Sequence, residues 1–293
     1  MPILVLARDD VHNLLPPGEC VEVMREALRS LAAGHVHQPL RMVVRPPEAA
    51  GLMALMPSFL GGDEPRFGLK AVCVFHGNPA LGKDAHQGSV LLFDGGTGEP
   101  MALANGSAVT ELRTAAVSAV ATDALARPDA SRTYAHAQRL ADALGPPAVA
   151  CESTMDAITG ADIVVTVTTS AEPVLRYEWL APGTHVNAVG SSIPTSREID
   201  TATMAAASLF VDRRESTVNE SGDYLFAARE GAIGPEHIRA EIGDVLAGTA
   251  PGRADPDEIT LFKSLGLAVE DLASVSYLYA KAQKLGVGTW VDF

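Results

Sequence analysis

Short apolar runs follow one another closely in the first part of the chain, each bounded by Gly, Pro, Asn or Asp. Runs with these boundaries predict strands joined by tight turns. They lie at 41–45, 51–56, 68–75, 88–94 and 101–105. The segment 94–100, Asp-Gly-Gly-Thr-Gly-Glu-Pro, predicts the turn of one hairpin. The sequence therefore predicts a mostly antiparallel sheet for this part of the chain.

Helices are predicted around this sheet. Residues 11–15 and the amphipathic residues 20–33 predict two short helices near the N-terminus. The apolar run 109–119 predicts a longer helix that leads out of the sheet region. Residues 257–285 predict a helical tail that returns to the first domain.

After residue 133, helices and strands alternate. Helices are predicted over 134–144 and 154–158, and strands over 148–151, 163–168, 185–189 and 209–211. This alternation predicts a parallel sheet, and Val164, Val165 and Val167 indicate a strand that is buried on both faces. The predicted fold class is α/β. It combines a Rossmann-type parallel-sheet domain over 123–257 with an α+β domain formed by 1–122 together with 258–293.

The join between the two patterns lacks an expected motif. A dinucleotide-binding sheet opens with a strand, a G-x-G-x-x-G turn and a helix, but residues 128–134 hold only Pro-Asp-Ala-Ser-Arg-Thr-Tyr. About one βαβ crossover of ~30 residues has no counterpart. Three explanations are open: the polypeptide has residues that this sequence lacks, the gene carries a deletion, or the chain is a natural protein that is related to dinucleotide-binding enzymes but is not itself an enzyme. Removing a central strand exposes strand edges and apolar area, which favours the first two.

Composition narrows the classes of function. The 293 residues carry a formal net charge of −14, which argues against nucleic acid and anionic membranes as partners. No apolar run is long enough to span a membrane, and the N-terminus lacks the features of a signal peptide. We therefore expect a cytoplasmic protein whose three cysteines are free thiols. The spacing of His76, His86 and His185 indicates no metal site.

Two cations stand at apolar positions. Arg113 lies within the predicted helix 109–119, where it should either face a cleft or form an ion pair with an acid such as Glu111 or Asp123. Lys70 enters the apolar strand 68–75, where it either faces water or acts as a functional ammonium. The residues alone leave both alternatives open in each case.

Several blocks of the sequence resemble the ornithine cyclodeaminase/mu-crystallin family. They are 68–70, 87–94, 112–119, 183–190, 220–223 and 262–271, in order along nearly the whole chain. The resemblance implies a homodimer of a substrate domain and a Rossmann domain. It implies an NAD(P)H-dependent oxidoreductase that acts on C–N bonds of small imino or amino acids, such as a cyclic ketimine or a pyrroline-carboxylate. The alternatives are a catalytically silent binding or structural protein, an ornithine cyclodeaminase and an alanine dehydrogenase.

The resemblance also implies roles for single residues. Arg41 and Arg113 would bind the substrate carboxylate, a task that suits the planar guanidinium fork. Lys70 would be both catalytic and substrate-binding, donating a proton or a hydrogen bond. Ser192 falls where the family's cyclodeaminases have an aspartate, and a serine cannot act as a carboxylate base at neutral pH. This difference argues against ornithine cyclodeaminase and favours imine reduction, although a polar loop cap would explain the serine equally well.

The same resemblance implies a set of cofactor-binding residues. They are Ser131, Arg132, Thr133, Thr168, Val189, Gly190, Ser264 and Gly266. An Arg and a hydroxyl suit the 2′-phosphate of NADP, whereas NAD enzymes use an acid. NADP(H) is therefore favoured over NAD(H). The apolar stretches 51–56 and 72–75 need a covering surface, which predicts a two-fold homodimer through the first domain.

Overall fold

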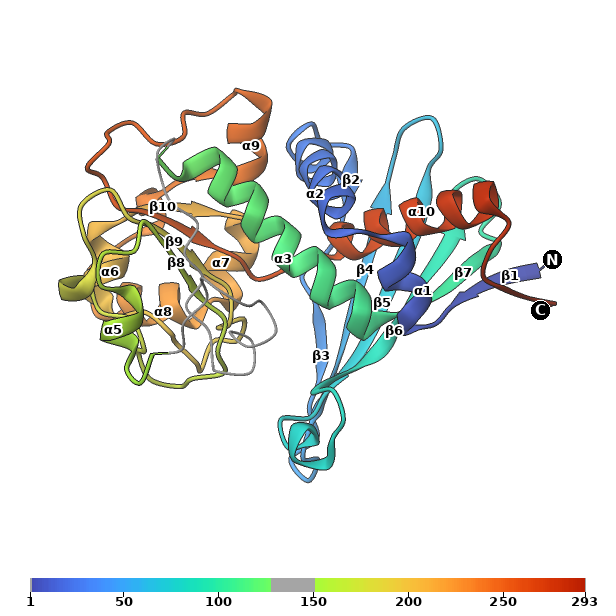
Figure 1. Ribbon diagram of the computed structural model, residues 1–293, viewed down its shortest axis with the longest axis horizontal. Coiled ribbons are helices and arrows are strands. Elements are labelled where there is room, and N and C mark those ends of the chain that lie inside the picture. Colours follow the sequence, from blue (N-terminus) through green and yellow to red (C-terminus); the bar gives the residue numbers. More distant parts are fainter. Residues whose placement is uncertain (1, 128–150, 293) are drawn as a thin grey trace. The chain divides into compact units, whose positions relative to one another are not determined.

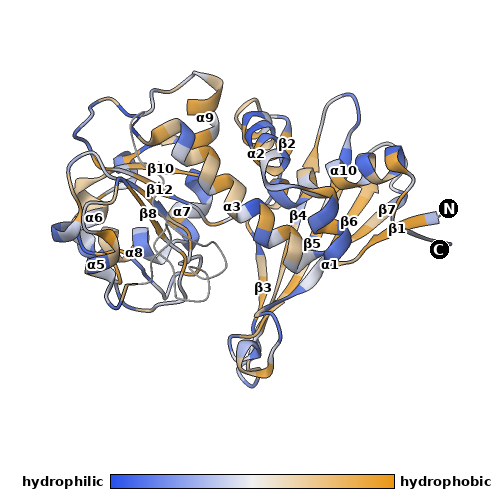
Figure 2. Cartoon of the chain, in the orientation of Figure 1, coloured by the Kyte–Doolittle hydropathy of each residue, from blue (hydrophilic) through white to orange (hydrophobic). Residues whose placement is uncertain are grey.

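The computed structural model describes residues 2–127 and 151–292 (Figure 1). The chain forms two compact units. Unit 1 comprises 1–120 and 266–293, and unit 2 comprises 121–265. In Figure 2 the strands of both units are largely hydrophobic, while many connecting loops are hydrophilic. No helix of the described residues is long and apolar enough to cross a membrane.

Unit 1 is built on an eight-stranded sheet with the order β13-β1-β7-β6-β5-β4-β2, in which β3 also pairs with β4. Its strands are β1 (Pro2–Leu6), β2 (Val36–His37), β3 (Met42–Val44), β4 (Leu52–Leu60), β5 (Arg66–Val74), β6 (His86–Asp94), β7 (Pro100–Asn105) and β13 (Thr289–Asp292). The pairing is antiparallel, as predicted, except that β1 runs parallel to β7. The 94–100 turn joins β6 to β7 as the sequence predicted, with Gly98 at a φ of 76°.

Helices α1 (Arg8–Leu14) and α10 (Ala268–Leu285) pack on one face of this sheet, and α2 (Pro17–Ala32) packs against α10. Helix α3 (Gly106–Leu125) leads from β7 into unit 2. Side chains of β5 alternate between the two faces, so Gly68, Lys70 and Val72 are buried on the helix side. The approach is close: a Cβ on Gly68 would lie 2.9 Å from Leu272 Cδ1 of α10. This packing places the start of α10 above the middle of the sheet.

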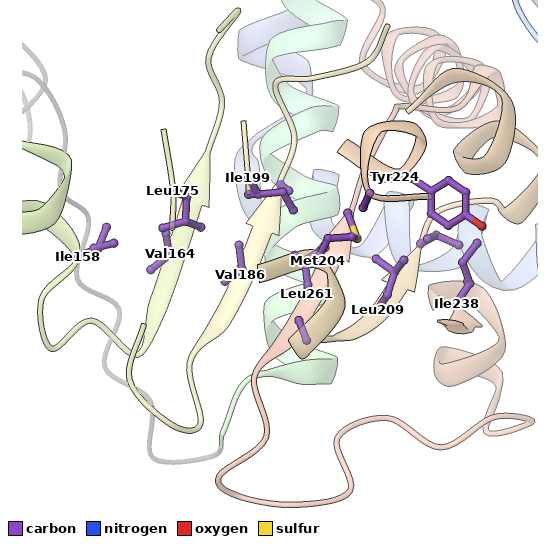
Figure 3. Close-up of a cluster of buried hydrophobic side chains, with 14 residues drawn as sticks. Ile158, Val164, Leu175, Val186, Ile199, Met204, Leu209, Tyr224, Ile238 and Leu261 are labelled. Atoms are coloured by element: carbon purple, nitrogen blue, oxygen red, sulfur yellow. The ribbon is translucent and has the colours of Figure 1, made fainter. Parts of the chain in front are cut away.

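Unit 2 contains a parallel five-stranded sheet with the order β11-β10-β12-β9-β8. Its strands are β8 (Ile163–Thr166), β9 (His185–Ala188), β10 (Ser208–Val211), β11 (Ile238–Glu241) and β12 (Thr260–Lys263). Its helices are α5 (Thr154–Ile158), α6 (Thr201–Ala206), α7 (Arg214–Glu220), α8 (Gly222–Arg229) and α9 (Ile242–Ala247). Figure 3 shows its core, where buried side chains such as Val164, Val186 and Leu261 come from neighbouring strands. The predicted α/β class with a parallel-sheet domain is confirmed.

Two sequence predictions need correction here. Residues 257–285 do not form a continuous helix, because Thr260–Lys263 is strand β12, which pairs with β9 and β10. Residues 258–265, assigned to the first domain, therefore lie in unit 2. The strand predicted over 163–168 is also not buried on both faces, since Val165 is 38% and Val167 is 59% exposed. Within the described residues, β8 pairs only with β9 and forms one edge of the sheet.

Candidate functional site

Lys70 lies on the helix-facing side of β5 and is only 3% exposed. Its Nζ donates to Asp271 Oδ1 at 3.0 Å, and Asp271 lies in the first turn of α10 with 1% exposure. The strand places the lysine in the interior because side chains alternate along it. Of the two alternatives left open by the sequence, the water-facing edge is therefore excluded.

Arg113 reaches the same turn of α10 from α3. Its Nη1 donates to Glu270 Oε2 at 2.9 Å, and its Nε lies 3.4 Å from Asp271 Oδ1. Glu270 is fully buried, and Arg113 is 6% exposed. The acid that pairs with Arg113 is thus distant in sequence, while Glu111 pairs with Arg8 at 2.7 Å. The ion pair holds the guanidinium in one orientation.

Arg41 completes the group of cations, which we call the clamp: Arg41, Lys70 and Arg113. Its Nη2 donates to the backbone carbonyl of Gly266 at 3.2 Å. Gly266 has a φ of 77°, a backbone conformation that favours glycine. The two arginines of the clamp therefore both approach Gly266, directly before α10 begins.

The start of α10 is tied to the chain near Arg41. The N-cap Leu267 provides no side-chain hydrogen bond, and the Val269 N–H instead donates to Gln38 Oε1 at 2.9 Å. A side chain from another segment thus satisfies one of the free N–H groups of the first turn. This contact fixes Gln38, three residues before Arg41, against the helix that carries Glu270 and Asp271.

The charged groups of this cluster are paired across the interior of unit 1. Lys70 contacts Asp271, and Arg113 contacts both Glu270 and Asp271. Burial lowers the pKa of Lys70 to about 8, against the opposing influence of Asp271. A lysine with this pKa can release a proton near neutral pH.

The predicted residues of unit 2 lie at the carboxyl ends of its strands. Thr168, Val189, Gly190 and Ser192 follow β8 or β9, the end of a parallel sheet at which α/β proteins bind ligands. Thr168 is exposed, and the other three are half-buried. A Cβ on Gly190 would lie 2.1 Å from the Thr168 carbonyl oxygen, so only glycine allows the two segments to meet. The structure therefore brings these four residues to one end of the sheet.

The remaining predicted cofactor residues are placed differently. Ser264 is 3% exposed, and its hydroxyl lies 3.5 Å from Asp212 Oδ2. Gly266 lies in unit 1 beside the clamp. Ser131, Arg132 and Thr133 lie outside the described residues.

Sequence reasoning missed the buried acids that organise both units. Glu270 and Asp271 hold Lys70 and Arg113, and Glu198 accepts hydrogen bonds from Gly190 N–H at 2.7 Å and from the Thr166 hydroxyl at 3.1 Å. Asp223 accepts from Glu198 N–H at 2.7 Å and lies 2.9 Å from Lys263 Nζ. The sequence did contain a signal for Glu270 and Asp271, because they are two adjacent acids in the apolar run Leu-Ala-Val-Glu-Asp-Leu-Ala. Acids at such positions need a partner of opposite charge, as Arg113 does.

Comparison with known proteins identifies the family. Residues 3–135 and 131–286 match the model of the ornithine cyclodeaminase/mu-crystallin family. The chain belongs to this family. It is 35% identical over 277 residues to ketimine reductase mu-crystallin of Mus musculus, with 84% of this chain and 85% of the relative covered. It is 34% identical over 327 residues to Delta(1)-pyrroline-2-carboxylate reductase of Bacillus thuringiensis subsp. konkukian, with 99% and 100% covered.

A solved structure agrees with these relatives. Thermococcus litoralis Delta(1)-pyrroline-2-carboxylate reductase, in complex with NADH and L-proline, superposes with a TM-score of 0.93 at 34% identity. The match covers 99% of this chain and 100% of that structure's chain. The family predicted from the sequence is confirmed.

The matches also locate the missing segment. The two family matches meet at 131–135. The alignment with the Bacillus reductase spans 327 positions against 293 residues here, so at least 34 of those positions have no residue in this chain. That difference has the size of one βαβ crossover, ~30 residues. The motif G-x-G-x-x-G occurs nowhere in the sequence.

Proposed function

We propose that this protein reduces the C=N bond of a small cyclic imino acid, such as a pyrroline- or piperideine-carboxylate, with NAD(P)H as the hydride donor. The observation that carries the proposal is the clamp, in which two oriented guanidinium groups and the buried ammonium of Lys70 gather around the start of α10. A carboxylate beside an electrophilic imine carbon is the ligand class that such a site accommodates. The pyrroline-carboxylate and ketimine reductases among the relatives support the same substrate class.

The two arginines hold the substrate in this proposal. Arg113 is fixed by Glu270, and Arg41 is fixed by the Gly266 carbonyl, so both guanidinium groups are oriented before the substrate arrives. Preorganised donors lose little entropy on binding, and the guanidinium fork matches a planar carboxylate. The substrate carboxylate is thereby fixed in the orientation that presents its imine group.

Lys70 supplies the proton. At pH 7 a lysine with a pKa of about 8 is mostly charged, yet it gives up its proton far more readily than an exposed lysine. The proton goes to the imine nitrogen, which makes the adjacent carbon more electrophilic. Nicotinamide supplies the hydride when the cofactor is bound. Ser192 provides no carboxylate base, which argues against an ornithine cyclodeaminase.

The described residues fit only part of a dinucleotide. Thr168, Val189 and Gly190 offer hydroxyl and backbone groups at the carboxyl ends of parallel strands, which suits the nicotinamide end. The glycine turn that normally binds the pyrophosphate at a helix N-terminus is missing from the sequence. We propose that NADP(H) is preferred, because Arg132 and Thr133 suit its 2′-phosphate. Comparing the KM values for NADPH and NADH tests this preference.

We further propose that two copies associate through the sheet face of unit 1 that is opposite α10. Phe67 on β5 and Met53 on β4 are 48% and 42% exposed on that face. Their neighbours on the same strands, such as Leu69 and Leu55, are only half-buried. An apolar sheet face of this kind normally has a partner, and a two-fold dimer covers it with one self-complementary interface.

The proposed reaction is tested by mixing the purified protein with Δ1-pyrroline-2-carboxylate or Δ1-piperideine-2-carboxylate and NAD(P)H. Loss of reduced nicotinamide absorbance that depends on the imine is the expected result. Release of ammonia from ornithine without net NAD(P)H consumption would indicate a cyclodeaminase and contradict the proposal.

The missing segment favours a second candidate, a protein that binds small imino or amino acids without catalysis. A fluorescence titration with NADPH separates the two. Saturable binding supports the reductase, whereas binding of proline without any NADPH binding supports the silent protein. Intact mass comes first, since a mass above 30.6 kDa shows that the polypeptide has residues that this sequence lacks.

A further inference from the structure

Two adjacent carboxylates, Glu270 and Asp271, are almost completely buried in the first turn of α10. Buried acids are rare and costly unless they are paired. These two would repel the substrate carboxylate that the clamp is proposed to bind. Their place beside the clamp therefore calls for a role that offsets this repulsion.

The two acids differ in their contacts: Asp271 contacts Lys70 as well as Arg113, whereas Glu270 contacts Arg113. Asp271 Oδ1 accepts from Lys70 Nζ at 3.0 Å, and Glu270 Oε2 accepts from Arg113 Nη1 at 2.9 Å. An arginine remains charged at every accessible pH, whereas a buried lysine loses its proton readily. Removing Glu270 therefore leaves the charge of its partner unchanged, while removing Asp271 changes the charge of Lys70.

We propose that Asp271 is a positioning residue that keeps the Lys70 side chain as an oriented ammonium, ready to donate its proton. Glu270 orients Arg113, and its influence on the protonation of Lys70 is smaller than that of Asp271. The part of this proposal that concerns imine reduction rests on the proposed function. The part that concerns the charge and orientation of Lys70 does not depend on the proposed function.

The surroundings of Lys70 support these different roles of Asp271 and Glu270. Burial lowers the pKa of Lys70, Asp271 is the strongest influence in the opposite direction, and Arg113 lowers the pKa further while Glu270 raises it. The charge of Lys70 also acts on His86 of β6, whose pKa is lowered by burial and by the charges of Lys70 and Arg113. Without Asp271, burial would act on Lys70 with far less opposition.

The direct test is the titration of Lys70 in protein labelled with 13C-lysine. The chain has only five lysines, so the spectrum is simple, and Lys70→Met identifies the signal. In the wild type we expect a midpoint near pH 8. Asp271→Asn should lower the midpoint by about 1–3 units, the usual effect of one close opposite charge. The matched variant Glu270→Gln, in the same helical turn, should lower it less.

A second measurement separates positioning from general stability. Asp271→Glu keeps the negative charge but moves it, so the Lys70 midpoint should stay near that of the wild type while kcat falls. In a plot of kcat against pH, the alkaline limb should shift to lower pH in Asp271→Asn and should stay at the wild-type pH in Asp271→Glu.

Three results would overturn the proposal. They are an unchanged Lys70 midpoint in Asp271→Asn, an equal shift in Glu270→Gln, and a wild-type midpoint above about 10, where a lysine is unperturbed. If Asp271→Asn does not fold, the Lys70 midpoints of the wild type and of Asp271→Glu still test the proposal. Expected midpoints without any imine reduction would support the role of Asp271 and contradict the proposed function instead.

Discussion

Gly266 lies directly against the guanidinium of Arg113: a Cβ on residue 266 would lie 2.5 Å from Nη1 and 2.9 Å from Nη2. The glycine also has a φ of 77°, and its carbonyl accepts from Arg41. One residue without a side chain thus lets two arginines converge at the start of α10.

Gly266→Ala should therefore disrupt substrate binding. The methyl group displaces the Arg113 guanidinium, and we expect the KM for the imine to rise about tenfold, equivalent to about 1.4 kcal/mol. Gly286→Ala is the matched control, since Gly286 also has a positive φ, 66°, but nothing lies within 4 Å of its added Cβ. Both variants should lose about 1–2 kcal/mol of stability, because alanine is strained at a positive φ, and the contact with Arg113 should add to the loss in Gly266→Ala. Steady-state kinetics and thermal melts check this, and equal KM values in the two variants would contradict it.

Arg113→Lys should weaken substrate binding while the protein remains folded. Lysine keeps the charge that Glu270 needs but cannot present two parallel N–H donors to a carboxylate. The KM should rise at least about tenfold, and kcat should change little, as expected when an interaction made equally in the ground state and the transition state is lost. The exposed Arg45, four residues after Arg41, provides the control Arg45→Lys. A raised KM in the control alone would assign the carboxylate to Arg45.

Lys70→Met should lower kcat much more than it raises KM. Removing a general acid typically costs about 10²–10⁴ in rate. The substitution keeps the volume, and Asp271 retains its contact with Arg113 Nε at 3.4 Å, so we expect the fold to survive. The exposed Lys83 gives the control Lys83→Met. Stopped-flow measurement of the hydride step decides the matter, and an unchanged rate would remove Lys70 from the proton transfer.

Local patterns in the sequence were enough to predict the strands of unit 1 from β3 to β7 and, in unit 2, α5, β8, β9 and β10. The helix predicted over 134–144 and the strand predicted over 148–151 lie outside the described residues, apart from residue 151. Local patterns were not enough for β1 and β13, which the sequence did not predict as strands. β1 pairs with β7 and β13, from distant parts of the chain, and such pairings leave no local signal. Strand β12 was also missed, because its apolar run was interpreted as part of the helical tail over 257–285.

The site shows a similar limit. The resemblance predicted the cations of the clamp, but their partners depend on the tertiary fold: Arg113 and Glu270 are 157 positions apart. Buried charges at apolar positions could be found in the sequence, whereas the pairing between them could not.

His185 in unit 2 should make the protein sensitive to acid. Burial lowers its pKa to about 3, and its Nδ1 lies 2.9 Å from Thr260 Oγ1. An unfolded histidine titrates near 6.5, so between about pH 6.5 and 3 the unfolded chain binds a proton that the folded chain does not. Stability should therefore fall by a few kcal/mol as pH decreases through this window.

Urea unfolding at pH 7 and pH 5 measures this effect. His185→Gln should flatten the difference between the two pH values, even if it destabilises the protein at both. The exposed His76→Gln serves as control and should keep the wild-type pH dependence. The pKa of His86 is lowered in the same direction, so part of the dependence should remain in His185→Gln. An undiminished dependence in His185→Gln would contradict the assignment.

The proposed dimer makes a prediction about Phe67. This side chain is 48% exposed on the sheet face opposite α10. The centroid of its ring lies 4.7 Å from the ring centroid of Phe59 on the neighbouring strand. If this face forms the interface, Phe67→Glu places a charge in an apolar contact and should convert the dimer to a monomer in light scattering at micromolar concentration. Leu81→Glu is the control, because Leu81 is 71% exposed but lies outside the sheet, in the 3-10 turn Asn78–Leu81. A monomeric wild type would refute the dimer. A dimer that survives Phe67→Glu would place the interface elsewhere, because no two-fold contact through this face could bury two glutamates without partners.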